Sequence, residues 1–437
     1  MRALCWMSAT QLARLVRLRQ VTAAEVVQAY LERIEEVNPA LNAVVQSDPD
    51  RALERARAAD RAAARGEWWG PLHGVPFTVK DWLETCDLVC TAGYPARLGH
   101  VPAADATAVA RMRQAGGILL GKTNAVSGNA LYGRTHNPYN LTCSPAGSSS
   151  GEAAILAAGG SPVGLGSDSG GSIRQPAHNC GIAGLKPTTG RVPLTGHYPR
   201  INVMNDPRTV IGPMARAVED LALVLSIVQG TDWRDASVVP VPLAEWRLVR
   251  LGSLRVAWYT ACPDGEPAPA VARAVEAAAA VLASSGLTVQ EAQPPAVEQT
   301  YEITREYWNR PEPESWEEWD AGEQTVLSSL AVEQHLFRWD RFRRALLAWM
   351  EPFDAVLTPA AQLPARPHDE EPGHIAYTLT YSLVGYPAAV VRCGTSEEGM
   401  PVGVQIVAQP WRDDVALALA AWLEKELGGW QQAGLVI

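Results

Sequence analysis

The sequence has no apolar stretch long enough to cross a membrane and no excess of basic residues. No run approaches the ~18 consecutive apolar residues that suggest a spanning helix. Lysine and arginine total 37 against 47 aspartates and glutamates, a formal net charge of −10. Proteins that neutralise many nucleic-acid phosphates are usually basic, so no nucleic-acid partner is expected. The negative charge also disfavours binding to an anionic membrane surface.

Cysteine is sparse, and its spacing does not suit a metal site. Seven cysteines are spread over 437 residues, and only Cys86 and Cys90 lie close together. No second pair or nearby histidine completes a zinc-type cluster, so we expect reduced thiols and no metal. The first residues lack the apolar core of a secretory signal. We therefore expect a cytoplasmic protein, and its oligomeric state stays open, a homodimer included.

The remaining composition is typical of a soluble globular protein. Hydrophobic residues make up 47% and charged residues 19%, which excludes disorder, collagen or coiled coil as the main state. A folded chain of this length buries roughly three-quarters of its unfolded surface, so a large core is available. No internal repeat or low-complexity tract is present.

The first 66 residues are predicted to form a helical segment that packs on the core. In Thr22–Glu25 the two end side chains form a capping box, and apolar residues then recur at helical spacing. Pro39 is predicted to follow the end of this helix. A second helix is predicted to begin at Asp48-Pro49 and to run to Gly66.

From residue 67 to residue 437, short apolar runs alternate with helical stretches. The predicted strands include residues 75–79, 118–120, 163–166, 254–259, 287–289 and 402–407. The predicted helices include residues 106–115, 152–158, 268–284 and 413–426. This alternation indicates an α/β domain with a substantially parallel sheet.

Two short motifs match known patterns without the local structure that those patterns need. Gly116–Thr123 fits a phosphate-binding loop, but a helix precedes it and its central residues favour a buried strand. Gly147–Gly151 fits the nucleophile elbow, but Pro145 makes the preceding residues a poor strand. None of the downstream histidines has an evident catalytic context. A non-catalytic nucleotide-binding protein that uses Gly116–Thr123 is kept as an alternative.

Residues 144–190 are the part of the chain richest in glycine and hydroxyl side chains. Ser169–Ser172 contains two glycines, which let backbone amides converge where a carbonyl oxygen becomes negative. A serine there needs a base. Lys80 follows an apolar strand, so burial would lower the pKa of its amine. Spacing alone leaves open both a Ser–Lys pair and an ordinary ion pair of Lys80 with Asp81.

The stretch Pro145–Thr188 closely resembles the amidase signature, a long motif of two glycine- and serine-rich runs followed by Ile-Arg-x-Pro-Ala. Further similarity lies at Gly74–Asp81, Gly121–Asn124, Gly212–Met214, Gly385–Ala388 and Pro401–Gln405. The resemblance therefore covers most of the chain. It implies a single large α/β domain with a central twisted, mixed and mostly parallel β-sheet flanked by helices.

The same resemblance implies a serine amidase with a Ser-cisSer-Lys triad, which hydrolyses a carboxamide C–N bond through an acyl-enzyme. Ser172 takes the place of the nucleophile, Ser148 that of the bridging serine that shuttles protons, and Lys80 that of the base. A small-molecule amide is the implied substrate. Such a reaction needs no metal or organic cofactor.

The resemblance also assigns roles in the loop that carries the nucleophile. The oxyanion hole would consist of the backbone amides of Ser169, Gly170, Gly171 and Ser172. Asp168 and Arg174 match positions that brace this loop and are predicted to be structural.

The sequence departs from the signature at Ala146 and Ser150, where the family usually has glycine. Each adds a side chain in a tight loop, so strain is expected there. Ser149 and Ser150 are close rivals of Ser148, which is chosen by the family register counted back from Ser172.

An alternative within the family is the A subunit of a glutamyl-tRNA amidotransferase, which releases ammonia from glutamine inside a complex. That protein typically has a Gly/Ala-Tyr-Tyr-rich helical segment, and Leu327–Phe337 departs from it.

The sequence does not identify the residues of the substrate pocket. The tryptophan-rich segment 301–323 is interpreted as a surface excursion or a flap over the substrate entrance. The aromatic residues that would line an acyl pocket, or only pack in the core, are Tyr377, Tyr381 and Tyr386.

Overall fold

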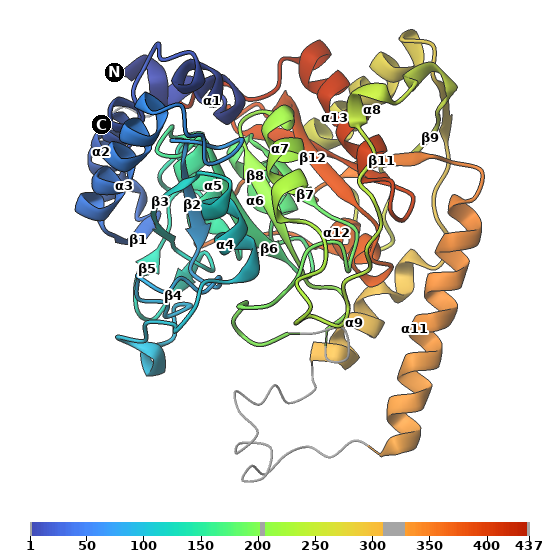
Figure 1. The fold of residues 1–437 in the computed structure, drawn as a ribbon. Coiled ribbons are helices and arrows are strands. Elements are labelled where there is room, and N and C mark those ends of the chain that lie inside the picture. The colour runs from blue at the N-terminus through green and yellow to red at the C-terminus, as the bar shows by residue number, and fades with distance from the viewer. Residues whose placement is uncertain (1, 202–205, 309–327, 435–437) are drawn as a thin grey trace.

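The computed structural model describes residues 2–201, 206–308 and 328–434 (Figure 1). Its main feature is an 11-stranded sheet in the order β1-β3-β2-β6-β8-β7-β12-β13-β11-β9-β10. The strands of this sheet are β1 (Val44–Ser47), β2 (Pro76–Lys80), β3 (Ile118–Thr123), β6 (Val163–Asp168), β7 (Ala183–Lys186), β8 (Val210–Ala215), β9 (Arg255–Trp258), β10 (Thr288–Glu291), β11 (Ala355–Pro359), β12 (Ala388–Thr395) and β13 (Pro401–Ala408). A separate hairpin pairs β4 (Gly128–Asn129) with β5 (Gly133–Arg134).

The sheet is mixed, as the sequence predicts. Parallel pairs join β3, β2 and β6 next to the edge strand β1, and β11, β9 and β10 at the opposite edge. The strands between these two groups pair antiparallel. Apolar runs identify buried strands but do not give their direction, which depends on the connections.

Helices cover both faces of the sheet. The main helices are α1 (Ala9–Arg17), α2 (Ala23–Leu41), α3 (Pro49–Ala64), α4 (Thr107–Gln114), α5 (Ser150–Ala157), α6 (Arg174–Cys180), α7 (Val218–Val228), α8 (Pro269–Ser284), α9 (Thr300–Trp308), α11 (Ser329–Met350), α12 (Ala376–Leu383) and α13 (Asp413–Leu427). On β12, Ala389 and Val391 join the large core with α7, α8 and α13, whereas Val390 joins a core cluster with α5 and α6. Because successive strand residues point to opposite faces, these two helix groups cover opposite faces.

The N-terminal segment contributes a strand to the sheet, in addition to the predicted helices. The capping box of Thr22 and Glu25 forms as expected, and Asp48 caps α3. The predicted helix end before Pro39 is wrong, because α2 continues through Pro39 and ends at Leu41. Strand β1, which was not predicted, pairs antiparallel with β3. The division of the chain into 1–66 and 67–437 stays a prediction.

The fold brings the ends of β2 and β6 together. These strands are parallel neighbours, so Lys80 and Asp168, their last residues, lie at the same edge of the sheet. The Gly116–Thr123 motif is not a phosphate-binding loop, because Ile118–Thr123 form strand β3, which lies between β1 and β2, and Lys122 is fully buried. Within the described ranges, we find no helix with the length and apolar character of a membrane span.

Candidate active site

Lys80 is fully buried at the end of β2, a strand whose five residues are all buried. Its Nζ lies 2.5 Å from Ser148 Oγ and 3.0 Å from Ser167 Oγ. Burial lowers the pKa of this amine well below its usual 10.5, and the Asp168 carboxylate offsets only part of the effect. The Trp82 ring centroid lies 3.9 Å from Nζ. The structure therefore gives the amine hydroxyl partners in a dry environment, which favours its neutral form.

Ser148 is the serine of its run that faces a pocket. A cis peptide bond joins Gly147 to Ser148, as the resemblance predicts. The rivals are fully buried: the Ser149 hydroxyl donates to the Ser167 carbonyl, and the Ser150 hydroxyl donates to the Val126 carbonyl at 2.9 Å. Neither rival side chain contacts Lys80 among the described residues. Ser148 is therefore the serine of this run that both contacts the Lys80 amine and lines the pocket.

Strain was expected where Ala146 and Ser150 replace glycine. Ala146 does lie in the left-handed region, with φ of 61°, which costs a residue with a Cβ about 1–2 kcal/mol. Ser150 instead begins helix α5 without such a backbone conformation. The expectation is confirmed at Ala146 only.

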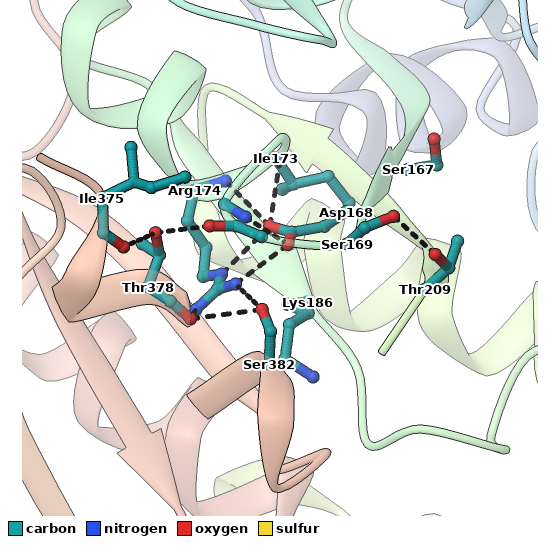
Figure 2. Close-up of polar contacts among 12 residues, drawn as sticks. Ser167, Asp168, Ser169, Ile173, Arg174, Lys186, Thr209, Ile375, Thr378 and Ser382 are labelled. Carbon is teal, nitrogen blue, oxygen red and sulfur yellow. Dashed lines mark hydrogen bonds and ion pairs between the residues drawn. The ribbon is translucent and has the colours of Figure 1, made fainter. Parts of the chain in front are cut away.

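The Ser169–Ser172 loop is held by a buried carboxylate, that of Asp168 (Figure 2). It accepts hydrogen bonds from the backbone amides of Gly171 at 2.8 Å and Ile173 at 3.0 Å. The Arg174 guanidinium contacts it through two nitrogens, at 2.9 and 3.0 Å. Burial raises the pKa of Asp168, but the Arg174 charge and these hydrogen bonds lower it to about 2. Asp168 thus stays ionised.

Arg174 ties this loop to distant parts of the chain. Its guanidinium donates to the Thr378 carbonyl at 2.8 Å and to Ser382 Oγ at 2.6 Å, both on α12 (Figure 2). It also donates to the Gln405 side chain on β13 at 2.7 Å. Thr378 Oγ1 in turn donates to the Gly170 carbonyl at 2.6 Å. These contacts hold the Ser169–Ser172 loop against α12 and β13.

The backbone amides of the loop are not equivalent. Gly171 N–H donates to the Asp168 carboxylate at 2.8 Å, so this amide is occupied in the structure. A Cβ at Gly171 would lie 2.5 Å from Thr378 Oγ1, and its φ is 136°. In the part of the chain that the structure describes, the amides of Ser169, Gly170 and Ser172 make no hydrogen bond. These three are free to meet an oxygen in the pocket.

Ser148 and Ser172 line one pocket of about 300 Å³. Its wall also includes Ser169, Gly170 and Gly171, together with Trp82, Gln175 and Ile375. Both hydroxyl residues are partly exposed. No hydrogen bond joins their side chains, and such contacts often tighten only when substrate is bound. No histidine within residues 2–201, 206–308 and 328–434 hydrogen-bonds to either serine.

The ordinary ion pair of Lys80 with Asp81 is not formed. The Asp81 carboxylate lies 3.6 Å from Lys122 Nζ and accepts hydrogen bonds from Thr91. Lys122, the lysine of the misleading Gly116–Thr123 motif, is therefore a structural partner of Asp81.

Sequence reasoning missed Ser167, Trp82 and Glu152. The Glu152 carboxyl is fully buried and accepts hydrogen bonds from Thr78 Oγ1 at 2.5 Å and Thr123 Oγ1 at 2.9 Å. Burial raises the pKa of Glu152 to about 8. The sequence signal for Glu152 was its position as an acidic residue in an otherwise apolar helical stretch. Trp82 follows Lys80 by two positions, and Ser167 lies in the Gly-Ser-Asp run of the signature, but neither position indicated a contact with the Lys80 amine.

The aromatic candidates for an acyl pocket are core residues. Tyr377, Tyr381 and Tyr386 are buried and do not line the pocket of Ser148 and Ser172. Tyr377 Oη donates to the Thr260 carbonyl at 2.5 Å, and Tyr381 Oη contacts Tyr259 Oη at 3.1 Å. Most of segment 301–323 lies outside the described residues, so the flap interpretation stays a prediction.

Comparison with known proteins places the chain in a family. The family model described as Amidase matches residues 25–311 and 314–417. The acylamidase of Rhodococcus erythropolis is 32% identical, over 96% of this chain and 95% of that protein. The A subunit of the glutamyl-tRNA(Gln) amidotransferase of Salinispora arenicola is 33% identical, over 97% of each chain. The solved structure of a fatty acid amide hydrolase superimposes with a TM-score of 0.87 at 26% identity, covering 98% of this chain and 86% of that one.

The chain therefore belongs to the amidase family and is a serine amidohydrolase that acts on amide bonds. Its Ser-Ser-Lys residues are characteristic of that family.

Proposed function

We propose that Ser172 is the nucleophile, Ser148 the proton shuttle and Lys80 the base of amide hydrolysis. The observation that carries this proposal is the 2.5 Å contact of the buried Lys80 amine with Ser148, in a pocket that Ser148 and Ser172 share. A neutral amine accepts the Ser148 proton while Ser148 accepts the proton of Ser172. The Ser172 oxygen then attacks the amide carbonyl carbon and forms a tetrahedral intermediate.

Collapse of this intermediate breaks the C–N bond. Amines leave poorly unless protonated, so the proton on Lys80 returns through Ser148 to the leaving nitrogen. The acyl group stays on Ser172 as an ester. A water molecule, deprotonated along the same route, then hydrolyses that ester and releases the carboxylic acid. All the groups used are side chains and backbone amides, so the scheme calls for no cofactor.

The oxyanion of the intermediate is proposed to bind the free amides of Ser169, Gly170 and Ser172. Donors fixed before the reaction stabilise developing charge at little reorganisation cost, and losing one typically costs about 3–4 kcal/mol. Asp168 and Arg174 are proposed to act structurally, by holding this loop in place.

An ammonia-releasing glutaminase that works inside a complex is the second candidate, because the A subunit of a glutamyl-tRNA(Gln) amidotransferase is among the relatives. Such a protein works with partner chains. A self-sufficient amidase would turn over simple amides when purified alone, whereas an amidotransferase component would need its partners and tRNA. We also propose a cytoplasmic location, which the seven free cysteines support.

The test is labelling with a fluorophosphonate probe followed by an amide panel. Wild type should be labelled and should hydrolyse at least one simple amide, while Ser172→Ala should lose both properties. Lys80→Ala should fold but label slowly. Unchanged labelling of Ser172→Ala would overturn the nucleophile assignment.

A further inference from the structure

A second pocket, of about 330 Å³, adjoins the one that holds Ser148 and Ser172. Gln175 lines both pockets. Ala146 lines the second pocket and is followed directly by Gly147 and Ser148 of the first. Gln175 is therefore a shared wall of the two pockets. The proposed catalytic residues do not line the second pocket.

The wall of the second pocket carries one uncompensated positive charge. It includes two arginines and one carboxylate, and Arg366 forms an ion pair with Glu370. The guanidinium of Arg134 makes neither a hydrogen bond nor an ion pair within the described chain. Burial, followed by nearby His136 and Arg134, lowers the pKa of His368 from its usual 6.5, which favours the neutral form of this histidine. The free charge is that of Arg134.

Arg134 is held at the pocket by its backbone. It lies on β5 opposite Gly128 of β4. The Asn42 side-chain amide donates to the Tyr132 carbonyl at 2.6 Å and to the Arg134 carbonyl at 2.9 Å. A Cβ at Gly128 would lie 3.1 Å from Arg134 Cγ, so the glycine leaves room for the arginine stem to cross its partner strand. Arg134 is therefore an exposed residue on a short, tethered hairpin, and it lines the second pocket.

Gln175 adds polar groups between this charge and the nucleophile. Its backbone N–H donates to the Gly171 carbonyl at 2.7 Å, which fixes the residue against the nucleophile loop. Its side-chain amide is partly exposed and has no hydrogen-bond partner in the described ranges. The side-chain amide of Gln175 and the guanidinium of Arg134 are both hydrogen-bond donors without a partner among the described residues. They suit an anionic group bound in the second pocket, away from the scissile bond.

We infer that the second pocket binds a carboxylate of the substrate, so that the preferred substrates are amides carrying a carboxylate on the part that passes Gln175. This inference rests on the proposed function. Arg134 supplies the charge through paired N–H donors, and Gln175 orients the chain between the carboxylate and the scissile bond. The carboxylate belongs either to the acyl part of the substrate or to the leaving amine. Amides that carry a carboxylate in one or the other part distinguish these two positions.

The test compares matched pairs of amides. Glutaramic acid, with an acyl-side carboxylate, is paired with pentanamide; N-butyryl-β-alanine, with an amine-side carboxylate, is paired with N-butyrylpropylamine. In wild type, the acid of one pair should have the higher kcat/KM. In Arg134→Gln that advantage should fall about tenfold or more through KM, as expected for a lost hydrogen bond to a charged group, while the neutral partner is unchanged. Arg344→Gln, an exposed arginine on α11, is the matched control and should change neither.

Two further measurements separate this inference from the proposed function. Glutarate should slow fluorophosphonate labelling of wild type but not of Arg134→Gln, whether or not any amide is turned over. Glu370→Gln, which frees Arg366, should lower the KM of the acid only. Efficient turnover of neutral amides with no preference for either acid, or an unchanged preference in Arg134→Gln, would overturn the carboxylate site and leave the amidase assignment intact. If the protein hydrolysed no amide but glutarate still slowed fluorophosphonate labelling of wild type, the carboxylate site would stand and the amidase assignment would be overturned.

Discussion

A single buried lysine supplies the proposed base, and the surroundings of its amine explain how. Lys80 Nζ has Ser148 and Ser167 as hydroxyl partners and the Trp82 ring beside it. Burial lowers the pKa of the amine. The charge of Asp168 opposes this shift, but Asp168 is ion-paired with Arg174. These surroundings therefore favour the uncharged form of the amine.

At this scale Ser148 should be distinguishable from its neighbours in the chain. Ser148→Ala removes the proposed shuttle, so kcat should fall by about 10²–10⁴, the range typical of a lost general acid–base group. Ser150→Ala, which removes a hydroxyl that donates only to backbone carbonyls, should keep kcat within a few-fold of wild type. Steady-state kinetics on one simple amide measure both. A larger loss in Ser150→Ala than in Ser148→Ala would show that the family register is misread.

Helix α5 and strands β2 and β3 meet at the Glu152 carboxyl, which bridges the elements behind the site. A Cβ at Gly164 on β6 would lie 1.8 Å from Glu152 Oε1, so this strand must pass without a side chain there. The bridge links the helix that follows Ser148 to the strand that carries Lys80. It positions both residues without contact to the pocket.

The bridge predicts a pH-dependent stability. The pKa of Glu152 is about 8 in the folded protein and ordinarily 4.5, so its contribution is fully present below 4.5 and is lost as pH rises through 8. Glu152→Gln keeps the shape and cannot ionise. The free energy of unfolding of wild type should therefore fall relative to Glu152→Gln between pH 5 and pH 9. Denaturant titrations at several pH values measure this difference, and a constant difference would contradict the buried neutral carboxyl.

Individual elements were largely predictable, but their pairing was less so. Capping residues and apolar periodicity located α2, α3, β2, β6 and β13 to within a few residues. Pro39 was misjudged because a proline near the end of a helix can be tolerated when packing continues. Strand direction in the middle of the sheet depends on connections that local sequence does not encode.

For the molecule as a whole, residues more than 200 positions apart in the sequence contact one another beside the Ser169–Ser172 loop. Arg174 joins Asp168 to Thr378 on α12 (Figure 2) and to Gln405 on β13. A shorter link in the sequence also holds the loop, since Ser169 Oγ lies 2.5 Å from Thr209 Oγ1. Asp168 and Arg174 were predictable from the family motif. Their partners Thr378, Ser382 and Gln405 were not, because only tertiary packing selects them.

This network predicts non-additive stability. Arg174→Leu leaves the Asp168 carboxylate buried without its cation, which should cost about 3–5 kcal/mol. Asp168→Asn combined with Arg174→Leu removes both charges and should cost less than the sum of the two single changes. Denaturant unfolding of the four proteins completes the double-mutant cycle. Additive costs would mean that the two side chains do not act as a pair.

The most direct test of the central claim is the pH dependence of the rate at which a fluorophosphonate labels Ser172. If neutral Lys80 removes a proton through Ser148, the rate in wild type should rise with pH through an inflection well below 10.5 and then level off. In Lys80→Met the rate should be far lower and this inflection should disappear. An inflection that persists unchanged in Lys80→Met would contradict the role of Lys80 as the base.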